Sequence, residues 1–324
     1  MTEGIEYLMV YLLLVIGFIL LIKGADLFVD GASNIASLLH IPPILVGLTI
    51  VAFGTSAPEA TVSIIAALEG SSDISLGNVI GSNILNTTLV VGLAAFIFPL
   101  KVETQTIKKE IPFTFLSGIA LLVMMSDVVL LGSSNLINRS DGIILLLFLS
   151  IFLFYVFEVA MNSRDKTHRE PEASNKSWGK SILITILGLA GVIYGGNLVV
   201  ENATTIAYAL GMSEALVGLT IIAIGTSLPE IVTSVTAALK KQSEIALGNI
   251  VGSNIFNILF VLGASSVISP LAVNNQVFID MYVMLILTII LFAFSRTKYK
   301  IGKKEGISLI VIYLVYLIYI IIRN

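Results

Sequence analysis

Long apolar runs separated by short polar segments dominate the chain. A helix of about 20 apolar residues spans the hydrocarbon core of a bilayer, and ten segments approach that length and composition. They run over 5–23 with a continuation toward 38, 42–67, 72–98, 112–131, 142–161, 181–203, 213–239, 243–269, 277–295 and 306–322. The pattern predicts an all-α integral membrane protein with ten transmembrane helices.

Composition supports the membrane class, because 56% of the 324 residues are hydrophobic and only 12% are charged. A soluble domain cannot bury that much apolar surface. The chain has no cysteine, which excludes disulfides and thiolate metal sites, and its small net charge of −3 argues against nucleic acid as a partner. The first apolar run lacks a basic leading region, so we expect a retained helix rather than a cleaved signal peptide.

Lysine and arginine are unevenly divided between alternate loops. If the N-terminus is outside, the outer segments hold only Arg139 and Arg323, and Lys23 lies within the first span. Nearly all other basic residues then fall on the inner side, where short loops of membrane proteins concentrate positive charge. We therefore expect a multi-pass protein of the cell membrane with both termini extracellular and the polar segment 162–180 cytoplasmic.

Two motifs occur twice in the sequence. Residues 47–63 read GLTIVAFGTSAPEATVS and residues 218–234 read GLTIIAIGTSLPEIVTS. At the same offset of 171 positions, LGNVIGSNILN over 76–86 matches LGNIVGSNIFN over 247–257. Shared Leu and Ile would arise in any two apolar helices, but shared Gly-Thr-Ser, Pro-Glu and Gly-Ser-Asn would not. The chain therefore contains an internal repeat.

Each repeat spans five predicted helices, and an odd number forces the two halves into opposite orientations in the membrane. We assign residues 1–161 to the first inverted repeat with helices 1–5, 162–180 to a cytoplasmic linker, and 181–324 to the second repeat with helices 6–10. In transporters, this architecture places the binding site near the bilayer midplane, between the repeats.

Each GTS-PE motif places a glutamate and a proline inside an apolar span. A carboxylate at membrane depth is costly unless it is paired or coordinated, so Glu59 and Glu230 are functional candidates. Pro58 and Pro229 lack the N–H that a helix requires. A proline alone could produce a simple kink, and a glutamate near a helix end could face water. Apolar residues continue on both sides, however, so we expect broken helices that line a cavity.

The second motif supplies neutral oxygen ligands. Ser82 and Asn86 lie four residues apart and share one helix face, as do Ser253 and Asn257. Hydroxyl and amide oxygens beside two carboxylates suit a hard cation such as Ca²⁺, which takes six to eight oxygen ligands. Transition metals would favour His or Cys, and His40 and His168, the two histidines, fall in predicted loops.

The paired motifs resemble the alpha repeats of the cation/Ca²⁺ exchanger superfamily, most closely the prokaryotic sodium/calcium exchangers with ten helices and a short central linker. The resemblance covers nearly the whole chain and implies alternating access around four clustered cation positions. The ligands that it implies are Ala52, Thr55, Ser56, Glu59, Ser82, Asn86, Ala223, Thr226, Ser227, Glu230, Ser253 and Asn257. Some relatives, including potassium-dependent ones, carry aspartate where this chain has Asn257, which counts against potassium co-transport.

The sequence therefore predicts a secondary-active Na⁺/Ca²⁺ antiporter, with Ca²⁺ and Na⁺ as transported ions and the lipid bilayer as surroundings. An H⁺/Ca²⁺ antiporter is the alternative within transport, and a cation channel is the alternative in another class, although a channel has no need of an inverted repeat. The absence of Cys, of membrane His and of an H-E-x-x-H motif argues against an enzyme. Nothing indicates an organic cofactor, a nucleic acid or a protein partner.

Overall fold

The structure is a computed structural model that describes residues 2–130, 132, 134–166, 177–212 and 223–323. The first half contains α1 Thr2–Leu39, α2 Pro43–Val46, the π-helical turn η1 Gly47–Val51, α3 Ala52–Thr55, α4 Ala57–Leu68, α5 Ser72–Leu85, the π-helical turn η2 Asn86–Val90, α6 Val91–Ile97, β1 Leu100–Lys101, the π-helical turn η3 Thr106–Glu110, α7 Ile111–Met124, α8 Asp127–Leu130, β2 Leu136–Ile137 and α9 Arg139–Lys166. The second half contains α10 Trp178–Ala209, α12 Ala223–Gly225, α13 Leu228–Leu239, α14 Ser243–Phe256, the π-helical turn η5 Asn257–Leu262, α15 Gly263–Ile268, β3 Leu271–Ala272, α16 Asn275–Arg296, β4 Lys300–Ile301 and α17 Lys303–Arg323.

The described residues include seven helices that are long and apolar enough to cross a membrane. An eighth span is added if Pro43–Thr55 and Ala57–Leu68, which meet at a bend of 46°, count as one. The molecule is thus a mainly helical, multi-pass membrane protein, as the hydropathy predicts. Residues 213–222 of the predicted span 213–239 lie outside the described residues, so the count of ten and the two-repeat division stay predictions.

Several predicted boundaries differ from the structure, as for the span predicted over 181–203, which is α10 Trp178–Ala209. The span predicted over 112–131 ends as α7 at Met124, where Ser126 interrupts the helix and the Asp127 carboxylate accepts a hydrogen bond from the Leu136 N–H at 3.2 Å. In the predicted linker, α9 continues to Lys166 and α10 begins at Trp178. The helices are therefore longer at the linker, and residues 167–176 lie outside the described part.

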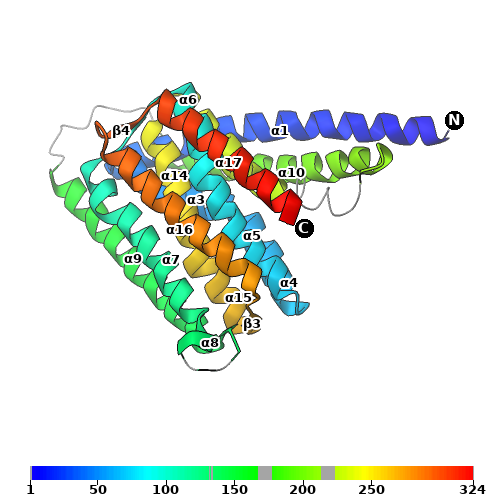
Figure 1. Ribbon diagram of the computed structural model, residues 1–324. Coiled ribbons are helices and arrows are strands. Elements are labelled where there is room, and N and C mark those ends of the chain that lie inside the picture. Colours follow the sequence, from blue (N-terminus) through cyan, green and yellow to red (C-terminus); the bar gives the residue numbers. More distant parts are fainter. Residues whose placement is uncertain (1, 131, 133, 167–176, 213–222, 324) are drawn as a thin grey trace.

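Helices α1 and α10 lie side by side and extend away from the other helices (Figure 1). Glycines bring their backbones together: a methyl group on Gly24 would lie 2.6 Å from the Val192 nitrogen, and Gly188 and Gly195 press equally closely on the backbone of α1. Small residues at such crossings let helices pack where no hydrophobic effect drives association. The two helices form a tightly packed pair.

Two short antiparallel strand pairs connect loops from opposite halves of the sequence. Strand β1 pairs with β4, and β2 pairs with β3. The alternation of predicted spans places the loops of β1 and β4 on one side of the membrane and those of β2 and β3 on the other. Each pairing therefore joins loops that the topology puts on the same side.

The helices that carry the Gly-Ser-Asn motifs lie at the centre of the molecule. In the apolar windows, 94% of the residues are buried for Ser243–Ile268 and 72% for Ser72–Ile97, against 22% for Arg139–Ser163. Polar residues on the two central helices are thus removed from both water and lipid, and they need partners within the protein.

Candidate cation site

Both GTS-PE motifs break their helices, as the prolines predict. Helix α3 ends at Thr55, and α4 begins directly after Ser56 with Pro58 in its first turn. A proline there loses no helical hydrogen bond, because the first N–H groups of a helix have no partner within it. The GTS-PE motif of the second half repeats the arrangement, since α13 follows Ser227 and carries Pro229 in its first turn. Each break therefore starts a new helix within the protein.

Each new helix carries its glutamate in the first turn, and both Glu59 and Glu230 are 0% exposed. Their hydrogen bonds cross between the halves. Ser227 Oγ donates to Glu59 Oε1 at 2.9 Å, and Ser56 Oγ donates to Glu230 Oε1 at 3.2 Å. The structure thus brings the two predicted carboxylates to one place, where each is bound by a serine from the opposite motif.

The serines of the Gly-Ser-Asn motifs complete the same arrangement. Ser82 Oγ lies 3.5 Å from Glu59 Oε1, and Ser253 Oγ lies 3.4 Å from Glu230 Oε1. The second oxygen of each carboxylate, Oε2, is buried and has no hydrogen-bond partner within the described structure. Buried, unpartnered carboxylate oxygens are costly, so these two atoms are natural ligands for a cation.

Among the residues that the structure describes, no basic side chain pairs with the two carboxylates. The ion pairs of the described residues join Lys240 to Asp26 and Asp30, and Arg323 to Asp280, and none involves either glutamate. The described part of the chain also holds no cluster of three or more His, Cys, Asp or Glu side chains that could together bind a metal ion. A cation bound here would therefore have two carboxylates and several neutral oxygens as ligands.

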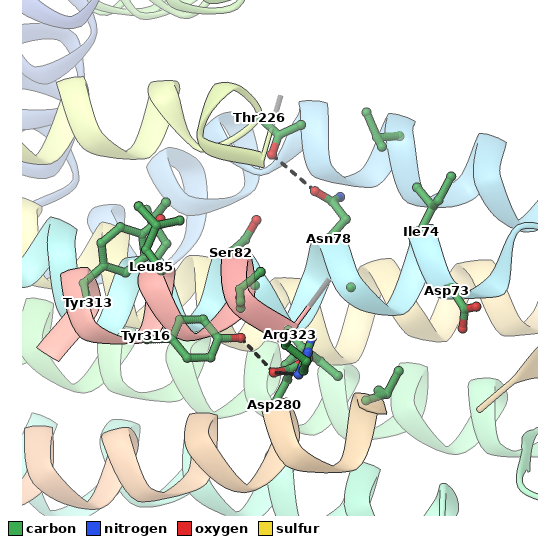
Figure 2. A pocket seen from close by; sticks show the side chains of 17 residues that line it. Asp73, Ile74, Asn78, Ser82, Leu85, Thr226, Asp280, Tyr313, Tyr316 and Arg323 are labelled. Carbon is green, nitrogen blue, oxygen red and sulfur yellow. Dashed lines mark hydrogen bonds and ion pairs between the residues drawn. The ribbon is translucent and has the colours of Figure 1, made fainter. Parts of the chain in front are cut away.

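The threonines of the two motifs are held by asparagines of the opposite half. Thr55 Oγ1 donates to Asn249 Oδ1 at 3.0 Å, and Thr226 Oγ1 donates to Asn78 Oδ1 at 3.2 Å, a contact visible in Figure 2. These bonds are equivalent under the internal repeat. Asn78 and Asn249, which belong to the Gly-Ser-Asn motifs, therefore each orient the threonine of the GTS-PE motif in the opposite half.

Ser63 and Ser234 support this arrangement but are not among the residues predicted from the sequence. Asn78 Nδ2 donates to Ser63 Oγ at 2.9 Å, and Asn249 Nδ2 donates to Ser234 Oγ at 3.0 Å. Both serines are buried and follow the motif glutamate by four residues. That repeated spacing, one helical turn after a buried acid, is the signal that could have found them.

The remaining predicted ligands occupy less uniform surroundings. Asn86 and Asn257 are 0% exposed, and the Oδ1 atom of each has no partner among the described residues. The Ala52 carbonyl accepts hydrogen bonds from Ser56 N at 3.0 Å and from Ser253 Oγ at 3.5 Å. Ala223 begins α12 in the corresponding break. His40, predicted to lie in a loop, is exposed in the turn after α1, and His168 falls outside the described residues.

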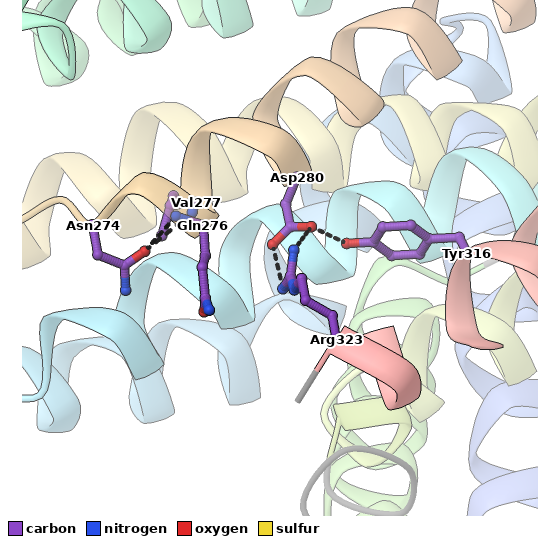
Figure 3. A network of polar contacts seen from close by, with 6 residues as sticks. All are labelled: Asn274, Gln276, Val277, Asp280, Tyr316 and Arg323. Atoms are coloured by element: carbon purple, nitrogen blue, oxygen red, sulfur yellow. Dashed lines mark hydrogen bonds and ion pairs between the residues drawn. The ribbon is translucent and has the colours of Figure 1, made fainter. Parts of the chain in front are cut away.

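A pocket of about 380 Å³ reaches the edge of this cluster. Asn78, Ser82 and Thr226 line it together with residues of α16 and α17 (Figure 2). Among those residues are Asp280 on α16 and Arg323 on α17, and Figure 3 shows how they interact. The Arg323 guanidinium binds the Asp280 carboxylate through two hydrogen bonds, of 2.8 and 3.0 Å.

Tyr316 adds a third donor to this group, since its hydroxyl donates to Asp280 Oδ1 at 3.1 Å (Figure 3). Bidentate arginine–carboxylate pairs combine charge with fixed geometry. The pair therefore cancels a positive and a negative charge in the wall of the pocket and fastens the end of α17 to α16.

Comparison with known proteins agrees with the geometry. The sequence profile of the family described as "Sodium/calcium exchanger protein" matches residues 9–158 and 180–322. The chain is 32% identical to the sodium/calcium exchanger MaX1 of Methanosarcina acetivorans, with 95% of this chain and 97% of MaX1 covered. It is 35% identical to the inner membrane protein YrbG of Escherichia coli, with 92% of each chain covered.

Solved structures of the sodium-calcium exchanger NCX_Mj are similar in fold. The one soaked with 10 mM Na⁺ and zero Ca²⁺ matches with a TM-score of 0.82 and 33% identity, covering 95% of this chain and 98% of NCX_Mj. A profile that matches both halves, relatives that match over nearly their full length and a shared fold lead to one conclusion. The chain belongs to the sodium/calcium exchanger protein family of membrane antiporters.

Proposed function

We propose that the protein is a secondary-active Na⁺/Ca²⁺ antiporter that works by alternating access around a midplane cation site between two inverted five-helix repeats. The site consists of the two glutamates and the hydroxyl, amide and carbonyl oxygens around them. The ligand set is Ala52, Thr55, Ser56, Glu59, Ser82 and Asn86 with Ala223, Thr226, Ser227, Glu230, Ser253 and Asn257.

One observation carries the proposal. Glu59 and Glu230 are fully buried, each is bound by a serine of the other half, and the Oε2 atom of each lacks a partner in the described residues. Two buried negative charges without a basic partner would be strongly destabilising if they stayed unneutralised. Hard oxygen ligands from both halves favour Ca²⁺ and Na⁺ over transition metals.

The charge of the site favours exchange between these two ions. One Ca²⁺ balances two carboxylates. Three Na⁺, the exchange number that the family resemblance suggests, would leave one surplus positive charge for the neutral oxygens to accommodate. Either ion therefore satisfies the carboxylates, but the two cannot occupy the same positions together. Such mutual exclusion is what couples the ions in an antiporter.

The decisive experiment measures ⁴⁵Ca²⁺ flux in proteoliposomes that contain the full chain. We expect uptake that requires an opposing Na⁺ gradient and continues when the pH gradient is collapsed. Uptake that follows a pH gradient and ignores Na⁺ would instead establish an H⁺/Ca²⁺ antiporter. Electrical currents far above transporter turnover would establish a channel.

The orientation in the membrane is also part of the proposal: both termini extracellular and the segment 162–180 cytoplasmic. The absence of cysteine allows a direct test, because Ser134→Cys and Ser174→Cys introduce single thiols. In intact cells an impermeant thiol reagent should label position 134 and spare position 174. The reverse pattern would invert the topology.

A further inference from the structure

The hydrogen bonds around the two glutamates obey the internal repeat, but those around the two motif asparagines do not. The side-chain bonds from Ser56 and Ser253 to Glu230, and from Thr55 to Asn249, each have an equivalent 171 positions away. The next pair, Asn86 and Asn257, lacks this equivalence, because the two side chains are held differently.

Asn257 is held by a partner from the opposite half. Its Nδ2 donates to Asn83 Oδ1 at 3.1 Å, and Asn83 is itself fixed because its own Nδ2 donates to the Asn254 carbonyl at 3.2 Å. All three side chains are buried. The amide of Asn257 is thus fixed by its nitrogen, and its oxygen remains unpartnered within the described structure.

The equivalent bond would run from Asn86 Nδ2 to Asn254 Oδ1, and it is missing among the described residues. The Asn254 amide is oriented by another contact, since its Nδ2 donates to Thr87 Oγ1 at 2.9 Å. Both amide atoms of Asn86 and the Oδ1 of Asn254 then have no partner in the part of the chain that the structure describes. The position equivalent to Thr87 is Ile258, which has no hydroxyl. The contact that orients the Asn254 nitrogen in one repeat is therefore unavailable in the other.

We propose that Asn83 is a positioning residue that fixes the Asn257 carbonyl as a cation ligand, and that Thr87 prevents Asn254 from doing the same for Asn86. This inference rests on the proposed function. A preorganised ligand loses less conformational freedom on binding than a free one. The Asn257 end of the site would then bind Na⁺ through a fixed amide oxygen, whereas Asn86 must be ordered by the ion itself.

The repeat supplies a matched pair of variants. Asn83→Ala removes the acceptor that holds Asn257, and Asn254→Ala makes the same truncation at the equivalent position. In proteoliposomes, Asn83→Ala should raise the half-saturating Na⁺ concentration about tenfold, the effect of one hydrogen bond, and leave the maximal rate within about twofold. Asn254→Ala should change both quantities by less than about twofold, because Asn254 holds no ligand.

A third variant tests the role of Thr87 independently. Thr87→Ile copies Ile258 and removes the hydroxyl that binds Asn254 Nδ2. Asn254 can then turn its Oδ1 atom toward the Nδ2 atom of Asn86 and accept a hydrogen bond from it. We expect the half-saturating Na⁺ concentration to fall by about threefold, as expected when a ligand is preorganised. The Na⁺-induced rise in melting temperature of the detergent-purified chain gives the same ranking without transport: Thr87→Ile largest, then parent and Asn254→Ala, then Asn83→Ala.

The outcomes separate this inference from the proposed function. A parent chain without any response to Na⁺ overturns both. If the parent responds but Asn83→Ala and Asn254→Ala shift Na⁺ affinity equally, or if Asn83→Ala lowers only the maximal rate, the positioning role is wrong and the antiporter remains. Should Asn83→Ala fail to fold, Thr87→Ile decides, because unchanged Na⁺ affinity in that variant also contradicts the proposal.

Discussion

The glycine faces of α5 and α14 carry the same sequence spacing but differ in their contacts with the described residues. A methyl group on Gly248 would lie 2.6 Å from the Ile44 carbonyl oxygen, and one on Gly252 would lie 2.6 Å from the Ala52 Cβ. At the equivalent Gly77 and Gly81, a methyl group would meet no described atom within 4 Å. Both of these glycines line the pocket beside Ser82.

The bonds to the two glutamates are nearly identical in both halves, so the motif specifies the site. The α14 glycine face is covered by Ile44, Gly47 and Leu48, whose repeat equivalents at 215, 218 and 219 lie outside the described residues. Because the repeats are equivalent, we expect the matching segment to cover the α5 face in at least one state of the transport cycle.

The largest expected effect concerns the feature that the halves share equally. Glu59→Gln and Glu230→Gln should each reduce Ca²⁺ flux by about 100-fold or more, because a single carboxylate poorly compensates a divalent ion away from water. The measurement is ⁴⁵Ca²⁺ flux in proteoliposomes at equal protein content. Near-normal flux in one variant would mean that the halves contribute unequally and that this glutamate is structural.

The glycines test the unequal feature directly. Gly252→Ala forces a methyl group against Leu48 and Ala52. It should lower the free energy of unfolding of this conformation by about 1–3 kcal/mol, which is typical of overpacking. Gly81→Ala brings its methyl group within 4 Å of no described atom and gains helix propensity, up to about 1 kcal/mol. The melting temperature should therefore fall for the first variant and hold or rise for the second.

Transport provides the complementary measurement for the same two glycines. If the α5 face becomes covered during the cycle, Gly81→Ala should lower Ca²⁺ flux about tenfold, although the protein stays stable. Ser71→Ala, outside the predicted ligand set in the turn before α5, serves as a substitution control. A stable Gly81→Ala protein with parental flux would show that no backbone approaches this face closely during transport.

Substitutions of Asn86 and Asn257 should have a smaller effect on transport than substitutions of the glutamates. Asn257→Asp adds a third negative charge, so cations, protons included, should be attracted more strongly, with about a tenfold change in Na⁺ competition against Ca²⁺. Asn86→Asp should act in the same direction. We expect the parent to exchange without K⁺, since it lacks the third carboxylate, and flux with and without K⁺ on both sides measures this. A strict K⁺ requirement, or unchanged competition in Asn257→Asp, would separate these positions from the ions.

Much of the site follows from the sequence because local chemistry decides it. Pro58 and Pro229 have no N–H, so the helix breaks were predictable from the backbone alone. The spacing of Ser82 and Asn86 gives their shared face directly. The missing N–H groups also predict freed carbonyls near Ala52 and Ala223, and the family resemblance implies these two residues as ligands.

The partners of these residues could not be predicted in the same way. Periodicity shows which face a residue occupies but not which distant residue meets it, and the bond from Ser227 to Glu59 joins positions 168 residues apart. The role of Thr87 could not be predicted for another reason. Identical residues define the repeat, whereas the proposed role of Thr87 depends on a position where the halves differ, since the equivalent residue is Ile258.

The smallest expected effect lies in a charge difference between the halves. Lys240 Nζ lies 3.0 Å from Asp26 Oδ1 and 2.7 Å from Asp30 Oδ1, which joins α13 to α1. The residue equivalent to Lys240 is Glu69, which forms no ion pair with the described residues. Within the described ranges, therefore, a cation ties the motif helix to the α1–α10 pair in the second half alone.

Lys240→Gln should lower stability by at most about 1 kcal/mol at low ionic strength, because the partly exposed carboxylates of Asp26 and Asp30 make this a surface network. The loss should disappear near 1 M choline chloride, where charges at the surface are screened. Choline is used so that added Na⁺ does not itself stabilise the protein. Glu69→Gln, which breaks no described ion pair, is the matched control and should leave the melting temperature unchanged at either salt concentration. If the Lys240→Gln loss persists at high salt, the lysine stabilises α13 through its backbone contact, the 2.7 Å hydrogen bond to the Asp26 carbonyl, rather than through charge, and the electrostatic difference between the halves would have no energetic consequence.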